Sequence, residues 1–123
     1  MKLSQAEEQL MEFIWKCETA FMKDIMERYP EPKPASTTLA TLLKRLQDKG
    51  AIAYRLFGNS RQYYPLIAKD EYFSRYMNNI AKKFFGNSAL QLASFFTTAG
   101  NLSEKELEDL KKVVEMEIER KKK

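Results

Sequence analysis

The chain has 123 residues, 44% of them apolar and 31% charged, which suffices for one globular domain or for a small domain with a dimerisation extension. It contains no histidine and a single cysteine, Cys17, which excludes an intrachain disulfide, the usual zinc and copper sites, and catalysis by a Ser-His-Asp or Cys-His pair. We therefore expect no cofactor and no enzymatic activity. No apolar run follows the N-terminal residues that could form a signal peptide, and no run in the chain is long enough for a membrane span. We therefore expect a cytoplasmic protein.

The net charge of +4 is concentrated in one segment. Residues 33–65 carry six lysines and arginines and one acid, Asp48, so this segment has a charge of +5 and the rest of the chain about −1. A local basic surplus of this kind is typical of a surface that binds nucleic acid.

Residues 4–16 predict a first helix. Ser4 and Glu7 have the spacing of a capping box, in which each side chain accepts a hydrogen bond from the backbone N–H of the other residue. Apolar residues then recur at helical spacing and indicate a largely buried helix: Leu10, Phe13, Ile14 and Cys17. We expect Cys17 to be a small core residue and the acids of this helix to lie mostly on its solvent face.

A second helix is predicted from Thr19, as its N-terminal cap, to Tyr29. Pro30 ends it, and the proline-rich residues 30–34 form a stiff surface connection.

A third helix is predicted over residues 36–50, with Ser36 or Thr37 as its cap and Gly50 just past its end. Four leucines fall on one stripe and should face the core: Leu39, Leu42, Leu43 and Leu46. The opposite face carries Thr37, Thr41, Lys44, Arg45 and Asp48. Hydroxyls and cations suit phosphate oxygens and base edges, as a recognition helix requires, although a merely solvated face has a similar composition.

The periodicity changes from 3.6 to 2 after Gly50. Residues 52–57 alternate, residues 58–60 form a turn, and residues 61–64 run back before Pro65, which predicts a β-hairpin with cations near its tip. Three short helices followed by a hairpin is the order of a winged helix-turn-helix, in which the third helix enters the major groove and the hairpin lies along the neighbouring backbone.

The rest of the chain predicts three more helices: residues 69–85, a short apolar helix that ends near Gly100, and a last helix opened by the capping-box pair Ser103 and Glu106. These helices have more apolar surface than one small domain needs, so we infer a dimer interface. Its residues are Leu92, Phe95, Phe96, Leu107, Leu110, Val114 and Ile118. The alternative is that the helices fold back on their own winged domain.

Several segments resemble the penicillinase repressor and methicillin-resistance repressor family of bacterial winged-helix regulators. The matching segments are Leu3–Glu7 with Trp15, Thr38–Leu46, Asp48–Ile52, Tyr63–Leu66 and Leu102–Leu107. They follow the order of the family and cover nearly the whole chain.

The resemblance implies a homodimer that binds a palindromic operator in double-stranded DNA and represses β-lactam resistance genes. It places Thr37, Thr38, Thr41, Lys44 and Arg45 in the major groove, and Arg55 and Arg61 on the wing. We expect Arg45 to contact a base, and Thr37, Thr38, Lys44 and Arg61 to contact phosphates.

The resemblance also implies release by a regulatory protease, triggered by a membrane-bound β-lactam sensor. The Asn-Phe cleavage pair of the family is replaced here by Ser94, Phe95 and Phe96. The C-terminal cysteine pairs of copper-responsive relatives are absent, so we expect no release by metal.

The sequence thus predicts a mainly α protein with a small β-hairpin: a winged helix-turn-helix domain over residues 1–67 and a helical dimerisation region over residues 68–123. Two other functions remain open. One is a winged-helix module that binds another protein instead of DNA. The other is a winged-helix regulator whose apolar C-terminal helices bind a small ligand that releases the DNA.

Overall fold

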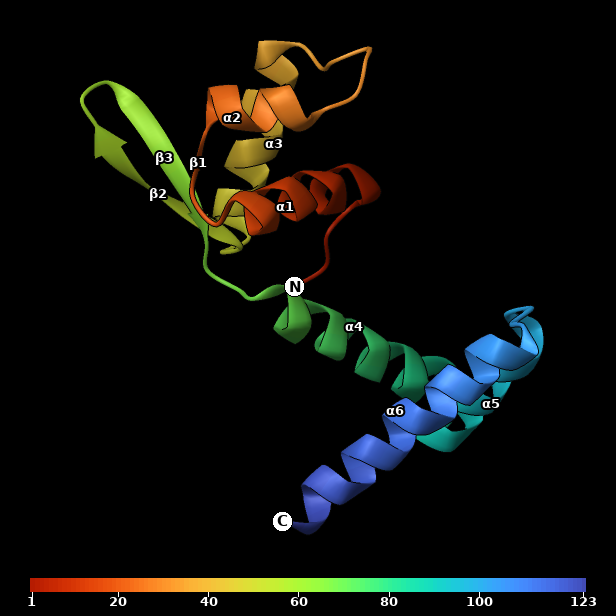
Figure 1. Ribbon diagram of the computed structural model, residues 1–123. Helices are drawn as coiled ribbons and strands as arrows, with labels where there is room; N and C mark the ends of the chain where they lie inside the picture. Colours follow the sequence, from red (N-terminus) through yellow and green to blue (C-terminus); the bar gives the residue numbers. More distant parts are fainter. The chain divides into compact units, whose positions relative to one another are not determined.

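The computed structural model describes residues 1–123 as six helices and three strands (Figure 1). The elements are α1 (Gln5–Cys17), β1 (Ala20–Phe21), α2 (Met22–Arg28), α3 (Ser36–Asp48), β2 (Ile52–Phe57), β3 (Ser60–Pro65), α4 (Lys69–Phe84), α5 (Ala89–Ala99) and α6 (Glu104–Lys122). The chain forms two compact units, Met1–Ser74 and Arg75–Lys123, which divide within α4, slightly after the boundary expected at residue 67. The predicted fold class is confirmed.

Helix α1 begins as its sequence predicts. The backbone N–H of Ser4 donates to Glu7 Oε1 at 2.7 Å, and the backbone N–H of Glu7 donates to Ser4 Oγ at 3.2 Å. The capping box is therefore present, and it satisfies backbone donors that have no partner within the helix. Leu10, Met11 and Ile14 are buried, and Cys17 is half-buried against the core as expected.

The start of the second helix was predicted wrongly. Thr19 is not a cap, because residues Ala20 and Phe21 are extended and pair with Tyr63 and Gln62 of β3. Helix α2 begins only at Met22, and the carboxylate of Asp24 accepts the backbone N–H of Phe21 at 3.0 Å. The strand forms because a partner far along the chain supplies its hydrogen bonds.

Helix α3 buries the predicted leucine stripe, with Leu39, Leu43 and Leu46 almost completely out of water. Its start differs from the prediction. The helix begins one residue earlier than a Ser36 cap would require and two earlier than a Thr37 cap would require: Ala35 is the N-cap, and its carbonyl accepts the N–H of Leu39 at 3.0 Å. Gly50 follows the helix with φ +78°, a left-handed conformation that favours glycine.

The predicted hairpin is confirmed, and it belongs to an antiparallel sheet with the strand order β1-β3-β2. One sheet face carries Ala20, Ile52 and Tyr63, which are buried in the same core as the leucines of α3. We call this the inner face. The outer face carries Phe21, Ala53 and Tyr64, none of which is buried.

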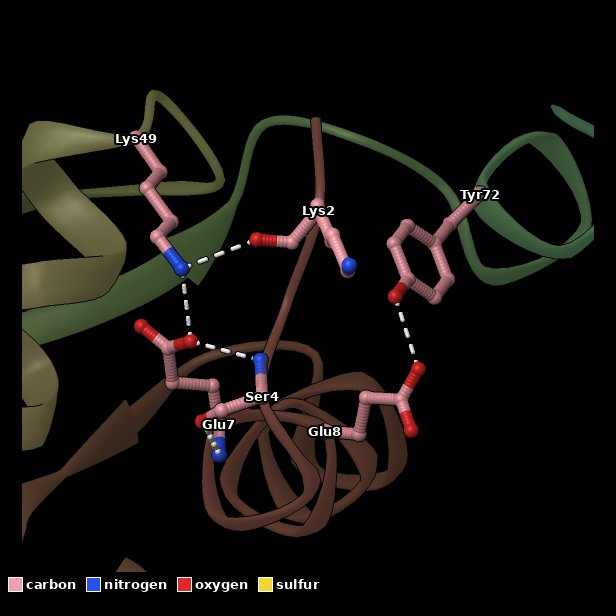
Figure 2. Close-up of polar contacts among 6 residues, drawn as sticks. All are labelled: Lys2, Ser4, Glu7, Glu8, Lys49 and Tyr72. Carbon is pink, nitrogen blue, oxygen red and sulfur yellow. Dashed lines mark hydrogen bonds and ion pairs between the residues drawn. The ribbon is translucent and has the colours of Figure 1, made fainter. Parts of the chain in front are cut away.

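The sequence predicted that the acids of α1 lie mostly on its solvent face, and Glu7 is an exception. The side chain of Glu7 is only 2% exposed, and its Oε1 atom accepts from Lys49 Nζ at 2.6 Å (Figure 2). Lys49 also donates to the carbonyl of Lys2 at 2.8 Å. Burial alone would raise the pKa of the Glu7 carboxyl, but the hydrogen bonds from Lys49 and Ser4 outweigh burial and lower the pKa. This ion pair joins the start of α1 to the end of α3.

We call the first unit, Met1–Ser74, the winged unit. The first turn of α4 belongs to it and is attached to α1. Trp15 Nε1 donates to the carbonyl of Ile67 at 2.9 Å. The hydroxyl of Tyr72 donates to Glu8 Oε2 at 2.7 Å, as Figure 2 shows. Lys69 and Glu12 form an ion pair at 2.9 Å. These contacts fix the exit of the chain from the winged unit.

The second unit contains the rest of α4 with α5 and α6. Gly86 and Asn87 have positive φ angles and separate α4 from α5, and Ser88 then caps α5. Ser103 and Glu106 form the predicted capping box of α6. No residue of α5 or α6 is buried. None of the helices has the length and apolar character needed to cross a membrane.

Replacing Lys49 by methionine would leave the Glu7 carboxylate buried without its cation. We expect Lys49→Met to lower the free energy of unfolding by about 3 kcal/mol at neutral pH, the low end for a broken buried pair, because Lys49 itself is 38% exposed. The control Lys44→Met removes only a surface pair with Asp48 and should cost about 0.5 kcal/mol. Urea unfolding measures both losses.

The same comparison has a predicted pH dependence. Because the folded state lowers the pKa of Glu7, its stabilising contribution is present above the ordinary value of 4.5 and is lost as the pH falls through the lowered pKa. The stability difference between the wild-type protein and Lys49→Met should therefore narrow below pH 4.5. A difference that is independent of pH, or equal to that of Lys44→Met, would contradict the buried ion pair.

Candidate nucleic-acid interface

The exposed side of α3 is the first part of the candidate interface. Since the leucines occupy the side that faces the core, the side chains of Thr37, Thr41 and Arg45 project into solvent. Thr38 and Lys44 are also exposed. The structure therefore brings all five residues predicted for the major groove onto the accessible surface of one helix. Its diameter suits the major groove, which is about 12 Å wide.

The start of α3 leaves backbone donors available. Helices α1, α5 and α6 each have a serine hydroxyl that accepts a backbone N–H, whereas α3 has no side-chain cap. Its first turn, with Ser36 and Thr37, therefore presents N–H groups that a phosphate can accept. Further along, the hydroxyl of Thr41 donates to the carbonyl of Thr37 at 3.0 Å, so Thr41 presents acceptor lone pairs and a methyl group.

The two cations of α3 differ in their surroundings. Lys44 Nζ lies 2.9 Å from Asp48 Oδ1, in an exposed pair one turn apart. The guanidinium of Arg45 makes no hydrogen bond or ion pair, so all its donors are accessible. Its planar group can make two parallel hydrogen bonds to the O6 and N7 atoms of guanine.

Two of the six cations of residues 33–65 are used inside the protein. Lys33 Nζ donates to the carbonyls of Met26, Glu27 and Tyr29 at 3.0, 3.4 and 2.6 Å, which satisfies the end of α2. Lys49 is paired with Glu7. The local charge of +5 therefore overstates the charge available to DNA, because a count along the sequence includes cations with internal partners.

The wing holds its two arginines on aromatic rings. The Cζ atom of Arg55 lies 4.9 Å from the centre of the Tyr64 ring, and that of Arg61 lies 4.4 Å from the centre of the Tyr54 ring. Such cation–π contacts restrain the side chains while their N–H groups stay exposed. Both arginines are exposed, as expected for wing residues.

The sequence did not single out the apolar tip of the wing. Leu56 and Phe57 are 64% and 53% exposed beside the turn at Gly58 and Asn59. The sequence does contain a signal for this exposed apolar pair. Both residues stand directly before the turn of the hairpin, where side chains are exposed, and exposed apolar side chains mark interaction sites.

A family model described as Penicillinase repressor matches residues 3–116. The chain belongs to the penicillinase repressor family. The members of this family are transcriptional repressors and not enzymes, so the expectation that the chain is no enzyme is confirmed.

Named relatives agree with this assignment. The chain is 28% identical over 114 residues to the methicillin resistance regulatory protein MecI of Staphylococcus aureus strain N315, which covers 92% of this chain and 93% of the relative. It is 25% identical over 122 residues to the penicillinase repressor of Bacillus licheniformis, covering 98% and 95% of the two chains.

A solved structure also matches. The solution structure of the DNA binding domain of the repressor BlaI superposes with a TM-score of 0.52 at 28% sequence identity, over 58% of this chain and 88% of that one. The chain is therefore a DNA-binding repressor with a winged-helix domain.

The pair of Lys44 with Asp48 generates a prediction. Asp48 is the one acid of α3, and its charge repels phosphates that approach the helix. We expect Asp48→Asn to tighten binding to any duplex by about 2- to 5-fold, as removing one surface charge is worth about 0.5 to 1 kcal/mol. Titration of labelled DNA measures the change. The control Glu108→Gln, on α6, removes the same charge outside the winged unit; an equal gain there would contradict a local effect.

Proposed function

We propose that the protein represses transcription as a homodimer that binds an inverted repeat, with α3 of each protomer in the major groove of one half-site. The observation that carries this proposal is the surface of α3, where Thr37, Thr41 and Arg45 are exposed directly opposite a fully buried leucine stripe. The core fixes the direction in which these groups point. Half-sites read by two such helices lie about 34 Å apart, one turn of DNA.

The residues have different roles in this proposal. Arg45 has free donors and reads a base edge. Thr37, Thr38 and Lys44 hold phosphates, and Thr41 contacts base edges or the thymine methyl group. The wing arginines contact the backbone beside the major groove.

The dimer is supported by the apolar surface of the second unit. Of the predicted interface residues, Leu92 and Leu110 are half-buried, and the others are between 40% and 57% exposed: Phe95, Phe96, Leu107, Val114 and Ile118. A soluble protein rarely exposes so many large apolar side chains unless a partner covers them. A second copy of the chain is the partner that an inverted repeat requires.

The relatives named for methicillin resistance and penicillinase make β-lactam resistance genes the first targets to test. Release by proteolysis stays a prediction. Ser94, Phe95 and Phe96 are exposed, but they lie within α5, and the carbonyl of Ser94 accepts the hydroxyls of Thr97 and Thr98. A protease that binds extended peptides would need α5 to unwind here first.

Selection of bound sequences from a random duplex library tests the function. We expect enrichment of an inverted repeat with half-sites about one turn apart. Enrichment of no sequence, with only weak and salt-sensitive binding, would contradict the proposal and favour a module that binds another protein.

Arg45→Ala tests the base contact. We expect a loss of about 1 to 3 kcal/mol on the selected operator and a relaxed preference at one base pair, because a bidentate contact discriminates between bases. Binding to random DNA should change much less. Titrations of both duplexes measure this difference, and an equal loss on both would show that Arg45 contacts a phosphate.

Val114→Asp tests the dimer. A charge within the exposed apolar seam of α6 should yield monomers in sedimentation and weaken operator binding by about 100-fold or more, because the two half-sites are no longer engaged together. The control Lys112→Asp places the same side chain about 160° away around the helix and should leave the dimer intact. If Val114→Asp still forms dimers, the dimer interface does not include this seam of α6.

A further inference from the structure

One face of α1 carries the side chains that hold the start of α4. Glu8, Glu12 and Trp15 follow one another at intervals of four and three residues, so they share one side of the helix. The buried residues of α1 occupy a different side, about 120° away around the helix. This face is therefore available to a further element of the winged unit, and that element is the first turn of α4.

The contacts run in opposite order along the two segments. In order along α1, they are the contacts of Glu8 with Tyr72, Glu12 with Lys69 and Trp15 with Ile67. The two segments therefore run antiparallel here. From Glu8 to Trp15 the helix rises about 10 Å. A single contact would let α4 swing about it, whereas contacts spread over this length restrain its direction. We call these three contacts the α1–α4 clasp.

Aromatic packing shields the hydrogen bond of Tyr72 in this clasp. Tyr72 is only 3% exposed, and its ring centre lies 6.0 Å from that of Trp15 and 5.0 Å from that of Phe73. A hydrogen bond to a carboxylate is stronger where water is excluded than on the open surface. We therefore expect the bond between Tyr72 and Glu8 to contribute most to the clasp.

The first turn of α1 also holds the end of α3, as Figure 2 shows. Glu7 accepts a hydrogen bond from Lys49, directly after α3, and its neighbour Glu8 accepts one from Tyr72 of α4. Consecutive residues of a helix point about 100° apart, so the two carboxylates reach different elements. One turn of helix thus fixes both the end of α3 and the direction in which α4 leaves the winged unit.

We propose that the α1–α4 clasp determines which spacing between half-sites the repressor accepts, an inference that rests on the dimer proposed above. Each base pair inserted between two half-sites moves one of them by about 3.4 Å and turns it by about 35° around the DNA axis. Helix α4 continues from the winged unit into the second unit. A winged unit that follows the moved half-site by turning at the start of α4 must therefore break the clasp.

Glu8 and Tyr72 are positioning residues in this proposal, because they act on DNA binding through α3. The alternative is that the clasp only stabilises the winged unit. Its removal would then lower the stability and the fraction of active protein, but it would change binding to all operators by the same factor. The ratio of the affinities for two spacings separates these roles.

Operators of altered spacing provide the test. The selected operator is compared with derivatives in which one base pair is removed, or one or two are inserted, between the half-sites. We expect the wild-type protein to bind the derivatives much more weakly than the selected operator. Tyr72→Phe removes only the hydroxyl and should reduce this difference by about 10-fold, in keeping with the loss of a hydrogen bond to a charged group. Its binding to the selected operator should remain that of the wild type.

Variants of the partner and a matched control sharpen the comparison. Glu8→Ala should have the same effect as Tyr72→Phe, and the double variant no larger effect, because both changes remove the same hydrogen bond. Glu8→Gln keeps an acceptor and should keep most of the spacing preference. The control is Tyr29→Phe, since the hydroxyl of Tyr29 is buried in the same unit without a hydrogen-bond partner. It should bind as the wild type does, and thermal melting confirms that each variant is folded.

Two results would overturn this assignment. One is an unchanged spacing preference in folded Tyr72→Phe, whether or not its affinity for all operators falls together. The other is a wild-type protein that binds every spacing equally well. Failure of the proposed function itself gives a different result, because the wild-type protein would then select no inverted repeat at all.

Discussion

The orientation of the α3 surface that we propose contacts DNA depends on the burial of the leucines of this helix. Leu39, Leu43 and Leu46 are almost fully out of water, and each contributes about 1.5 to 3 kcal/mol by its burial. Turning the helix by one residue would expose this stripe, so its orientation is fixed by the core. The hydroxyls and the guanidinium on the opposite side are directed outward as a consequence. The proposed contact of α3 with DNA therefore depends on core packing, and the ion pair of Glu7 with Lys49 holds the far end of the same helix.

The features that could be predicted from the sequence are those with local causes. The capping boxes at Ser4 and Ser103 join residues three positions apart, and the leucine stripe and the hairpin turn are periodic patterns within one element. The strand that the sequence failed to predict has a distant cause. Ala20 and Phe21 form a strand only because β3, more than forty positions along the chain, pairs with them. The local sequence favours a helix cap at Thr19, but the pairing with β3 makes the next two residues extended.

The charge pattern shows the same limit in the candidate interface. The sequence reveals which residues are basic but not which of them have partners inside the fold. Lys49 and Lys33 look like their neighbours in the sequence, yet one neutralises a buried carboxylate and the other caps α2. The faces of Arg55 and Arg61 follow from alternation only once the pairing register is known, because a shift by one residue would move either arginine to the other side.

The small number of cations available to DNA in one protomer explains why the exposed apolar helices matter for binding. Of the six cations of residues 33–65, Lys33 and Lys49 have internal partners. Four remain at the proposed interface, Lys44, Arg45, Arg55 and Arg61, and so few phosphate contacts would yield only weak binding at physiological salt. The winged unit has its own buried core, whereas α5 and α6 bury no residue. In the proposed dimer, a second copy covers these helices and links two weak half-site contacts into one tight complex. A signal that separated the copies of this proposed dimer would release the operator without altering any residue proposed to contact DNA.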